Sequence, residues 1–244
     1  MLEGGHNASG RDDVLLSRTR EGAVDGLVYF GAQLVVAADG APALDAFAVE
    51  ARKHLGLRSF VGPKTAVDGV WQRVRSWHAQ PQIVRATQPL YLLEREALRA
   101  GRPEPEVRLA RDDEAELVAE NSAEMILAEL GYDPRVARSV FVAMVRRAIA
   151  AGVWWVWIVD GALRFQCNVG PRTAATAQIQ GVWTPPAARG NGWATLALGA
   201  IAGRLLERER TLSLYVNDFN APAIALYERL GFRRIGTFAT YLFA

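Results

Sequence analysis

The stretch Arg189–Ala194 contains the residue types best suited to chemistry in this chain. It reads Arg-Gly-Asn-Gly-Trp-Ala, and an apolar helical pattern follows at once. Glycines let the backbone approach a ligand closely, and a helix start leaves amide N–H groups without partners. The stretch therefore predicts a cradle for a phosphate or pyrophosphate. Neither the P-loop pattern GxxxxGK[ST] nor the Rossmann GxGxxG is matched, so an ordinary strand-to-helix turn is an equal alternative on this local pattern.

The neighbouring residues predict the elements that hold this loop. Residues 178–184 read as a short apolar strand that ends at Pro185-Pro186, because two prolines cannot continue a central strand. After the loop, apolar residues recur at helical spacing up to Leu206. They are Trp193, Leu196, Ala197, Ala200, Ile201 and Leu205.

The wording of the loop resembles a known signature. Arg189–Ala194 fits R/Q-x-x-G-x-G/A, which is typical of acetyl-CoA binding in the GNAT acetyltransferase superfamily, and the preceding GVWTPP resembles that superfamily's fourth strand. Downstream, Leu212–Phe232 reads LSLYVNDFNAPAIALYERLGF and resembles its fifth strand and fourth helix. Two ordered motifs at the right separation make the resemblance specific.

Composition excludes several other classes. Half of the 244 residues are hydrophobic and the net charge is +2, with no basic run interleaved with aromatics that would indicate nucleic-acid binding. Cys167 is the only cysteine, so no intrachain disulfide is possible. No segment reads as a signal peptide or a membrane span, because the longest apolar run is Val153–Val159. We expect a cytoplasmic protein with no membrane or nucleic-acid partner.

The first part of the chain alternates strand and helix patterns. Residues 1–13 are polar and Gly-rich and read as disordered, with strand signals beginning near Asp25. Two strands are expected within Asp25–Ala37, with further strands at 58–61, 83–86 and 90–93. Helices are expected at 43–55 and 65–77, the second with Thr65 as N-cap. Glu94–Pro105 is charged and rich in Gly and Pro, which predicts a linker.

The second part has a clearer order. A strand is expected at 106–109, then two helices, the first opening near Asp112 and the second over 136–151. Strands follow at 154–159, 163–169 and 175–184, then the helix after the loop, a strand at 211–216, a helix at 221–230 and two closing strands in 233–243. This order is also the order of the GNAT fold.

Two domains are expected. Residues 105–244 resemble a catalytic GNAT domain. Residues 1–100 resemble the degenerate GNAT-like domain that precedes it in tandem bacterial proteins, chiefly in SFVGPKTAVDGVW and QPLYLLE. The first domain has no acetyl-CoA signature, and its start reads as truncated. The fold class is therefore α/β (α+β), with two mixed, mostly antiparallel twisted sheets flanked by helices.

The resemblance also implies site residues. The pyrophosphate of acetyl-CoA would lie on the amides of Arg189, Gly190, Asn191, Gly192, Trp193 and Ala194, and its pantetheine arm along Val182 and Thr184. Asn220 would touch the arm, with a helix N-cap as an equal alternative. Tyr227 would protonate the leaving thiolate, and an unperturbed pKa near 10 would suit that role. No metal is expected.

The general base is where the sequence departs from the family. Amine-acetylating relatives carry a glutamate on the fourth strand, whereas Gln178 and Gln180 occupy that place here and cannot accept a proton. All three histidines lie in the first half of the chain. Glu124 and Glu129, on the helix that floors the acceptor site in the family, are the remaining carboxylates, although a solvated helix face explains them better. A water relay without a base is an equal alternative.

Two functions follow from these residues. The first is an N-acetyltransferase that moves an acetyl group from acetyl-CoA to a small-molecule amine or a protein amine. A homodimer is compatible with this function. The alternative is an acyl-CoA-binding module with little transferase activity, which the missing carboxylate and the degenerate first domain favour.

Overall fold

The computed structural model describes residues 2–6, 13–54, 56–101 and 105–243, and these form two compact units. The first unit contains residues 1–90, 215–219 and 236–244, and the second contains 91–214 and 220–235. The two expected domains, 1–100 and 105–244, are each continuous in sequence, whereas each of these units is made of separate segments. Strands β6 (Ile83–Glu94) and β12 (Arg233–Leu242) each have residues in both units. The mixed α/β class with largely antiparallel strands is confirmed.

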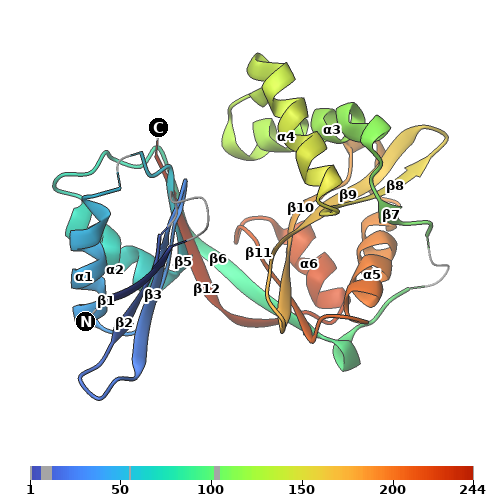
Figure 1. Cartoon of the computed structure of the whole chain (residues 1–244). Helices are drawn as coiled ribbons and strands as arrows, with labels where there is room; N and C mark the ends of the chain where they lie inside the picture. Colours follow the sequence, from blue (N-terminus) through green and yellow to red (C-terminus); the bar gives the residue numbers. More distant parts are fainter. Residues whose placement is uncertain (1, 7–12, 55, 102–104, 244) are drawn as a thin grey trace. The chain divides into compact units, whose positions relative to one another are not determined.

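The first unit is a sheet covered by two helices (Figure 1). Its strands are β1 (Leu2–His6), β2 (Asp13–Arg18), β3 (Val24–Phe30), β4 (Leu34–Ala38) and β5 (Ser59–Pro63), followed by the second half of β12 and the first half of β6. Only β4 and β5 pair in parallel among the pairs described here. Helices α1 (Ala41–Ala51) and α2 (Lys64–Val74) bury Phe47 and several small and branched residues in one core with Phe30 and Phe60 of the strands.

The start of this unit differs from the sequence prediction. Leu2–His6 and Asp13–Arg18 are strands that pair with each other, whereas residues 1–13 were expected to be disordered and strands to begin near Asp25. Residues 7–12 lie outside the described part of the chain. LEGGH has no alternation of apolar residues, so its strand conformation comes from pairing with β2 and not from local pattern.

Three local predictions are also wrong. Thr65 does not cap α2, whose N-cap is Pro63 without a side-chain hydrogen bond. Residues 83–94 form one strand that runs through Pro89, and residues 233–242 form one strand where two were expected. Pro89 still contributes its carbonyl oxygen, which accepts from the Val216 N–H at 3.2 Å. A proline lacks only the donor half of a ladder position, so a strand can continue through it.

The second unit has strands in its centre and helices on both sides (Figure 1). From the second half of β6 the strand order is β11 (Thr211–Tyr215), β10 (Thr176–Trp183), β9 (Ala162–Arg172), β8 (Trp154–Val159) and β7 (Arg108–Leu109). Helices α3 (Ala115–Leu130) and α4 (Arg138–Ala150) bury Val118, Ile149 and Trp154 on one side. Helices α5 (Trp193–Leu205) and α6 (Ala221–Arg229) cover the other.

Short 3-10 turns complete this unit. They span Arg95–Ala97, Asp112–Glu114, Pro134–Ala137 and Pro186–Ala188. The turn before α3 is fixed by Glu114, whose carboxylate accepts from the Arg111 N–H at 2.8 Å and pairs with Arg108 at 2.6 Å. Asp112 was expected to cap this helix, but Glu114 is the N-cap of α3 and the residue that binds the backbone before it. No helix among the described residues is both long and apolar enough to cross a membrane.

Candidate functional site

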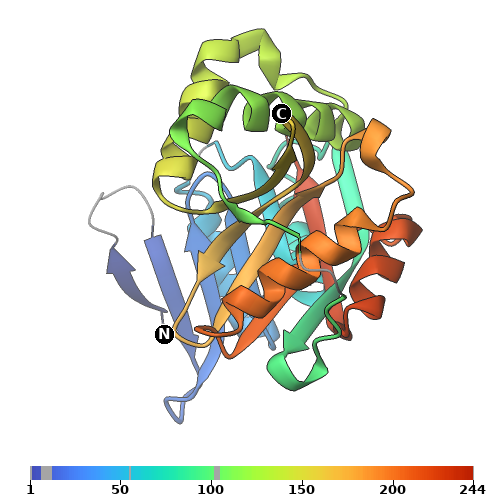
Figure 2. The same ribbon diagram turned by 90° about the vertical axis from the view of Figure 1, so that its right-hand side faces the viewer.

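The loop between β10 and α5 exposes an uncapped helix start. Gly190 and Gly192 have φ of +78° and +71°, the left-handed region that side chains with a Cβ avoid, and open space adjoins both Cα atoms. Gly192 is the N-cap of α5, no side chain caps the helix, and its first turn contains no acidic residue. Figure 2 shows this helix (orange) with the loop that precedes it. The amides at the start of α5 are thus available to an anion.

A cavity of about 540 Å³ adjoins this loop and lies within the second unit. All the predicted cofactor residues except Asn191 line it. They are Val182, Thr184, Arg189, Gly190, Gly192, Trp193, Ala194 and Asn220. Asn191 instead stabilises the loop from within, since its Nδ2 donates to the carbonyl oxygen of Arg189 at 3.0 Å. The structure therefore brings together residues that the sequence placed on two separate motifs.

Two arginines give the cavity its charge. Arg189 follows β10, and its Nε donates to the Thr184 carbonyl oxygen at 3.0 Å. Arg229 lines the cavity from the last turn of α6, and none of the described lining residues is acidic. Sequence reasoning missed Arg229. The helical spacing of Pro222, Leu226 and Arg229, which share one face of α6, is the signal that could have found it.

Asn220 caps α6 and also lines the cavity. Its side-chain oxygen accepts from the Ala223 N–H at 3.3 Å, which caps α6, and the residue also lines the cavity. The N-cap interaction fixes the orientation of the side chain at the cavity wall.

The pairing of β10 with β11 ends before β10 reaches the cavity. Its parallel pairing with β11 joins Thr176–Gln178 to Thr211–Ser213 and ends there among the described pairs. Gly181, with φ of +56°, lies in a register shift relative to β9 between Gln180 and Trp183. Such a bulge bends a strand and ends regular pairing. Among the described pairs, the edge of β10 on the β11 side has no ladder from Ile179 to Trp183, and Val182 lies in this part of the strand.

Tyr227 lies behind the cavity and not among its lining residues. Its ring is buried between Tyr91 and Phe232, with centroids 6.3 and 5.9 Å away. Burial raises the pKa of Tyr227 well above its ordinary value, and the negative charge of Glu129 raises that pKa further. The unperturbed pKa near 10 considered from the motif does not apply here, because the motif alone does not show these apolar surroundings. The hydroxyl stays protonated over a wide pH range.

The four predicted acceptor-site residues do not line the cavity either. Gln178 and Gln180 are half-buried on β10, and the Gln180 Nε2 donates to the Gln178 Oε1 at 2.7 Å. Glu124 and Glu129 are exposed on α3. Cys167 is fully buried in the core, and burial raises the pKa of its thiol. The described residues include no group of three or more His, Cys, Asp or Glu able to hold a metal ion.

Comparison with known proteins identifies the fold. Residues 172–242 match the family model of FR47-like proteins, and residues 14–118 match a domain of unknown function, DUF4081. A GCN5-related N-acetyltransferase from Kribbella flavida superposes with a TM-score of 0.60 at 16% identity, over 98% of this chain and 88% of its own. The chain has the GNAT fold. The resemblance predicted from sequence is confirmed, and the DUF4081 region fits a degenerate first domain.

Two further structures extend the comparison. A Drosophila protein gives a TM-score of 0.68 at 15% identity, over 96% of this chain and 80% of its own. A tandem GNAT protein from the clavulanic acid biosynthesis pathway gives 0.54 at 17% identity, over 95% and 82%. No curated protein matches the chain in sequence. At these identities the likeness shows the fold, and function has to be argued from the site.

Proposed function

We propose that this chain is an acyltransferase that moves the acetyl group of acetyl-CoA to an amine by direct attack. One observation carries the proposal. The uncapped start of α5, its two left-handed glycines and two arginines converge on one cavity beside an unpaired edge of β10. The GNAT acetyltransferases with which the chain shares its fold support the assignment of reaction class.

The phosphate end of acetyl-CoA fits the α5 side of the cavity. Backbone N–H groups and the helix dipole favour negative charge at this position. Arg189 and Arg229 add two full positive charges to the same wall. A side chain at Gly190 or Gly192 would occupy the open space through which a pyrophosphate reaches the amides.

The pantetheine arm fits along β10. An extended chain with amide groups can add to an exposed strand edge through main-chain hydrogen bonds. Val182 and Thr184, which line the cavity where β10 has left β11, are the positions that would hold it. This placement directs the thioester toward Gly181, beyond the last described pair of β10 with β11.

The chain's own residues then orient the reactants and supply one proton. Acetyl-CoA supplies a thioester carbonyl that an amine can attack. Tyr227, kept protonated by burial, would donate its hydroxyl hydrogen to the departing sulfur. Fixed hydrogen-bond donors and exclusion of water lower the barrier by positioning and electrostatic stabilisation.

Two measurements on the full chain test the proposal. Titration calorimetry with acetyl-CoA should give binding, and a thiol-release assay over a panel of amines should give CoA release that depends on the amine. Binding with no release for any amine would overturn the transferase and favour an acyl-CoA-binding module. Absence of binding would overturn both functions.

A further inference from the structure

Four carboxamide side chains share one face of the sheet in the second unit. Gln166 and Asn168 are two residues apart on β9, and Gln178 and Gln180 are two residues apart on β10. The register pairs Gln180 with Asn168, which places their side chains on the same face. We call these four residues the carboxamide face. It ends at Gly181, where β10 has diverged from β11.

The carboxamide face is tightly held. The Gln180 side chain lies over Gly170, where an added Cβ would be 2.6 Å from its Oε1, and it binds Gln178 at 2.7 Å. Gln166 is fully buried, and its Nε2 donates to Ser122 Oγ on α3 at 3.0 Å. The Gln166 Oε1 has no hydrogen-bond partner in the described part of the chain. Gln166 is enclosed, so this atom makes the inner side of the face polar but is not itself open to a ligand.

The strands around this face carry no acid or base of the usual kind. Strands β8, β9, β10 and β11 contain no Asp, Glu or His. Their ionisable residues are Arg164, Cys167, Arg172 and Tyr215. Arg164 stacks on the Trp193 ring at 4.9 Å, and the pKa of the Tyr215 hydroxyl is raised by burial.

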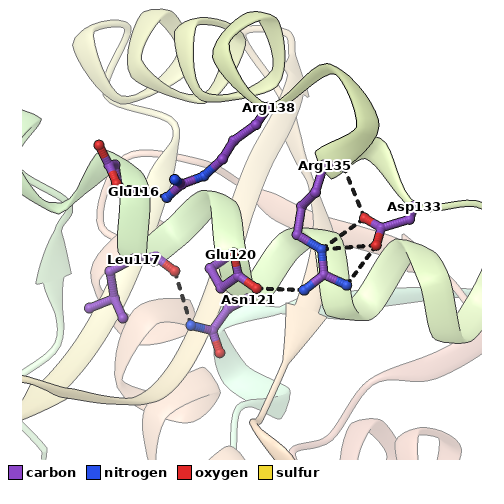
Figure 3. A network of polar contacts seen from close by, with 7 residues as sticks. All are labelled: Glu116, Leu117, Glu120, Asn121, Asp133, Arg135 and Arg138. Carbon is purple, nitrogen blue, oxygen red and sulfur yellow. Dashed lines mark hydrogen bonds and ion pairs between the residues drawn. The ribbon is translucent and has the colours of Figure 1, made fainter.

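Helix α3, which packs against β10, carries four glutamates. Two of them are ion-paired in the network of Figure 3, Glu116 with Arg138 at 2.8 Å and Glu120 with Arg135. Arg135 also binds Asp133 at 2.8 Å, which fixes the turn between α3 and α4. Glu124 and Glu129 are exposed, and the Glu129 charge reaches Tyr227 on α6. Glu129 is therefore the carboxylate that a test has to include.

Without a base on these strands, the protonation state of the amine decides which acceptors can react. When a neutral amine attacks the thioester, a C–N bond forms and the C–S bond breaks. The nitrogen loses one proton and the sulfur gains one, so no proton is left over. An ammonium ion carries one proton more, which a base has to remove first. At pH 7.5 about a third of an α-amino group with a pKa near 7.8 is neutral, against about 0.1% of a lysine-like amine with a pKa near 10.4.

We propose that the acceptor is a weakly basic amine, such as the α-amino group of a peptide or amino-acid amide, bound in its neutral form against the carboxamide face. This inference rests on the proposed transferase function. Carboxamides can donate to and accept from amide groups of such an acceptor without favouring its charged form. The position of the face beside Gly181, where the thioester arm would end, places the acceptor next to the reacting carbonyl.

The test compares matched amines on the full chain. Thiol release should have a kcat/KM about 100-fold or more higher with glycinamide than with Nα-acetyl-lysine amide at pH 7.5. For a series of α-amines, log kcat/KM should rise with pH and level off at the pKa of each amine. An equal or reversed preference, or a break at one pH for all amines, would overturn the inference but leave the transferase standing. No release with any amine would overturn both.

Variants distinguish binding of a neutral amine by the carboxamide face from removal of a proton by a base on the enzyme. Gln178→Glu should raise the rate with the lysine-like amine and add a pH break common to all amines, whereas Gln72→Glu, the same change at an exposed position of α2, should do neither. Glu129→Gln should leave the shape of the pH profile unchanged. Loss of the profile in Glu129→Gln would show an enzyme base and overturn the inference.

Discussion

The guanidinium of Arg189 lies over the indole ring of Trp183, 4.7 Å from the ring centre, where both residues line the cavity. Stacking on Trp183 restricts the motion of the Arg189 guanidinium, which would otherwise move in solvent. Its positive charge is thereby held beside the start of α5. We expect Arg189→Ala to raise the Kd for CoA about 10-fold at low salt. Arg189→Lys should recover only part of this loss, because an ammonium stacks less well.

Calorimetry at two salt concentrations measures this effect. Arg147→Ala, which removes an exposed cation from α4, is the control and should leave the Kd within about twofold. An equal change in both variants would mean that only net charge matters.

Gly192→Asp should abolish measurable CoA binding. The change adds strain at φ of +71° and places a carboxylate where the uncapped amides of α5 would receive a phosphate. Gly161→Asp is a matched control, because Gly161 has φ of +72° and is equally open, but lies in the turn between β8 and β9. Binding by Gly192→Asp at the level of Gly161→Asp would contradict a phosphate site at this loop.

Tyr227→Phe should lower turnover by about 100- to 10,000-fold, a range typical of one general acid, and leave CoA affinity largely unchanged. Because the pKa of Tyr227 is raised, its ionisation should not reduce activity between pH 8 and 10. Steady-state kinetics and calorimetry together measure the two effects. Tyr91→Phe removes the neighbouring hydroxyl, which donates to Glu228 at 3.0 Å, and should not lower turnover in the same way.

Glu114→Gln should destabilise the fold by about 1–3 kcal/mol, because the carboxylate is nearly buried and binds Arg108 and the Arg111 N–H. The hydrogen bond from Arg108 lowers the pKa of Glu114. A lowered pKa adds stability that is fully present above the unfolded value of about 4.3 and is lost as pH falls toward the folded pKa. Urea unfolding at pH 7 and pH 3.5 should therefore show a smaller difference between wild type and variant at the lower pH.

Glu116→Gln is the matched control for that measurement. Its partner Arg138 and the carboxylate itself are mostly exposed, so the change should stay within about 0.5 kcal/mol. A similar cost for both variants would show that burial at Glu114 has no special effect.

Sequence and structure agree where the signal is local. The turn at Gly190 and Gly192, the helix after it and the expected strands at 154–159 and 163–169 depend on neighbours along the chain, and all are found. The strand Leu2–His6 could not be predicted, because its conformation depends on pairing with β2. The cavity role of Arg229 and the raised pKa of Tyr227 depend on residues brought together from α5, α6, β6 and β10. Such environments do not follow from the spacing within one motif.

The pairing of β12 with β5 has a consequence for synthesis. Phe238–Leu242 completes the strand ladder against Ser59–Pro63 and supplies Ala239 and Tyr241 to the core of the first unit. A ribosome releases the chain from its amino end, so residues 13–90 emerge while their last strand has not yet been made. Until it arrives, the apolar surface around Phe60 and the edge of β5 stay open to other chains. Slow translation of the final segment, or a stop codon before residue 236, should therefore lead to aggregation of the part that was made first.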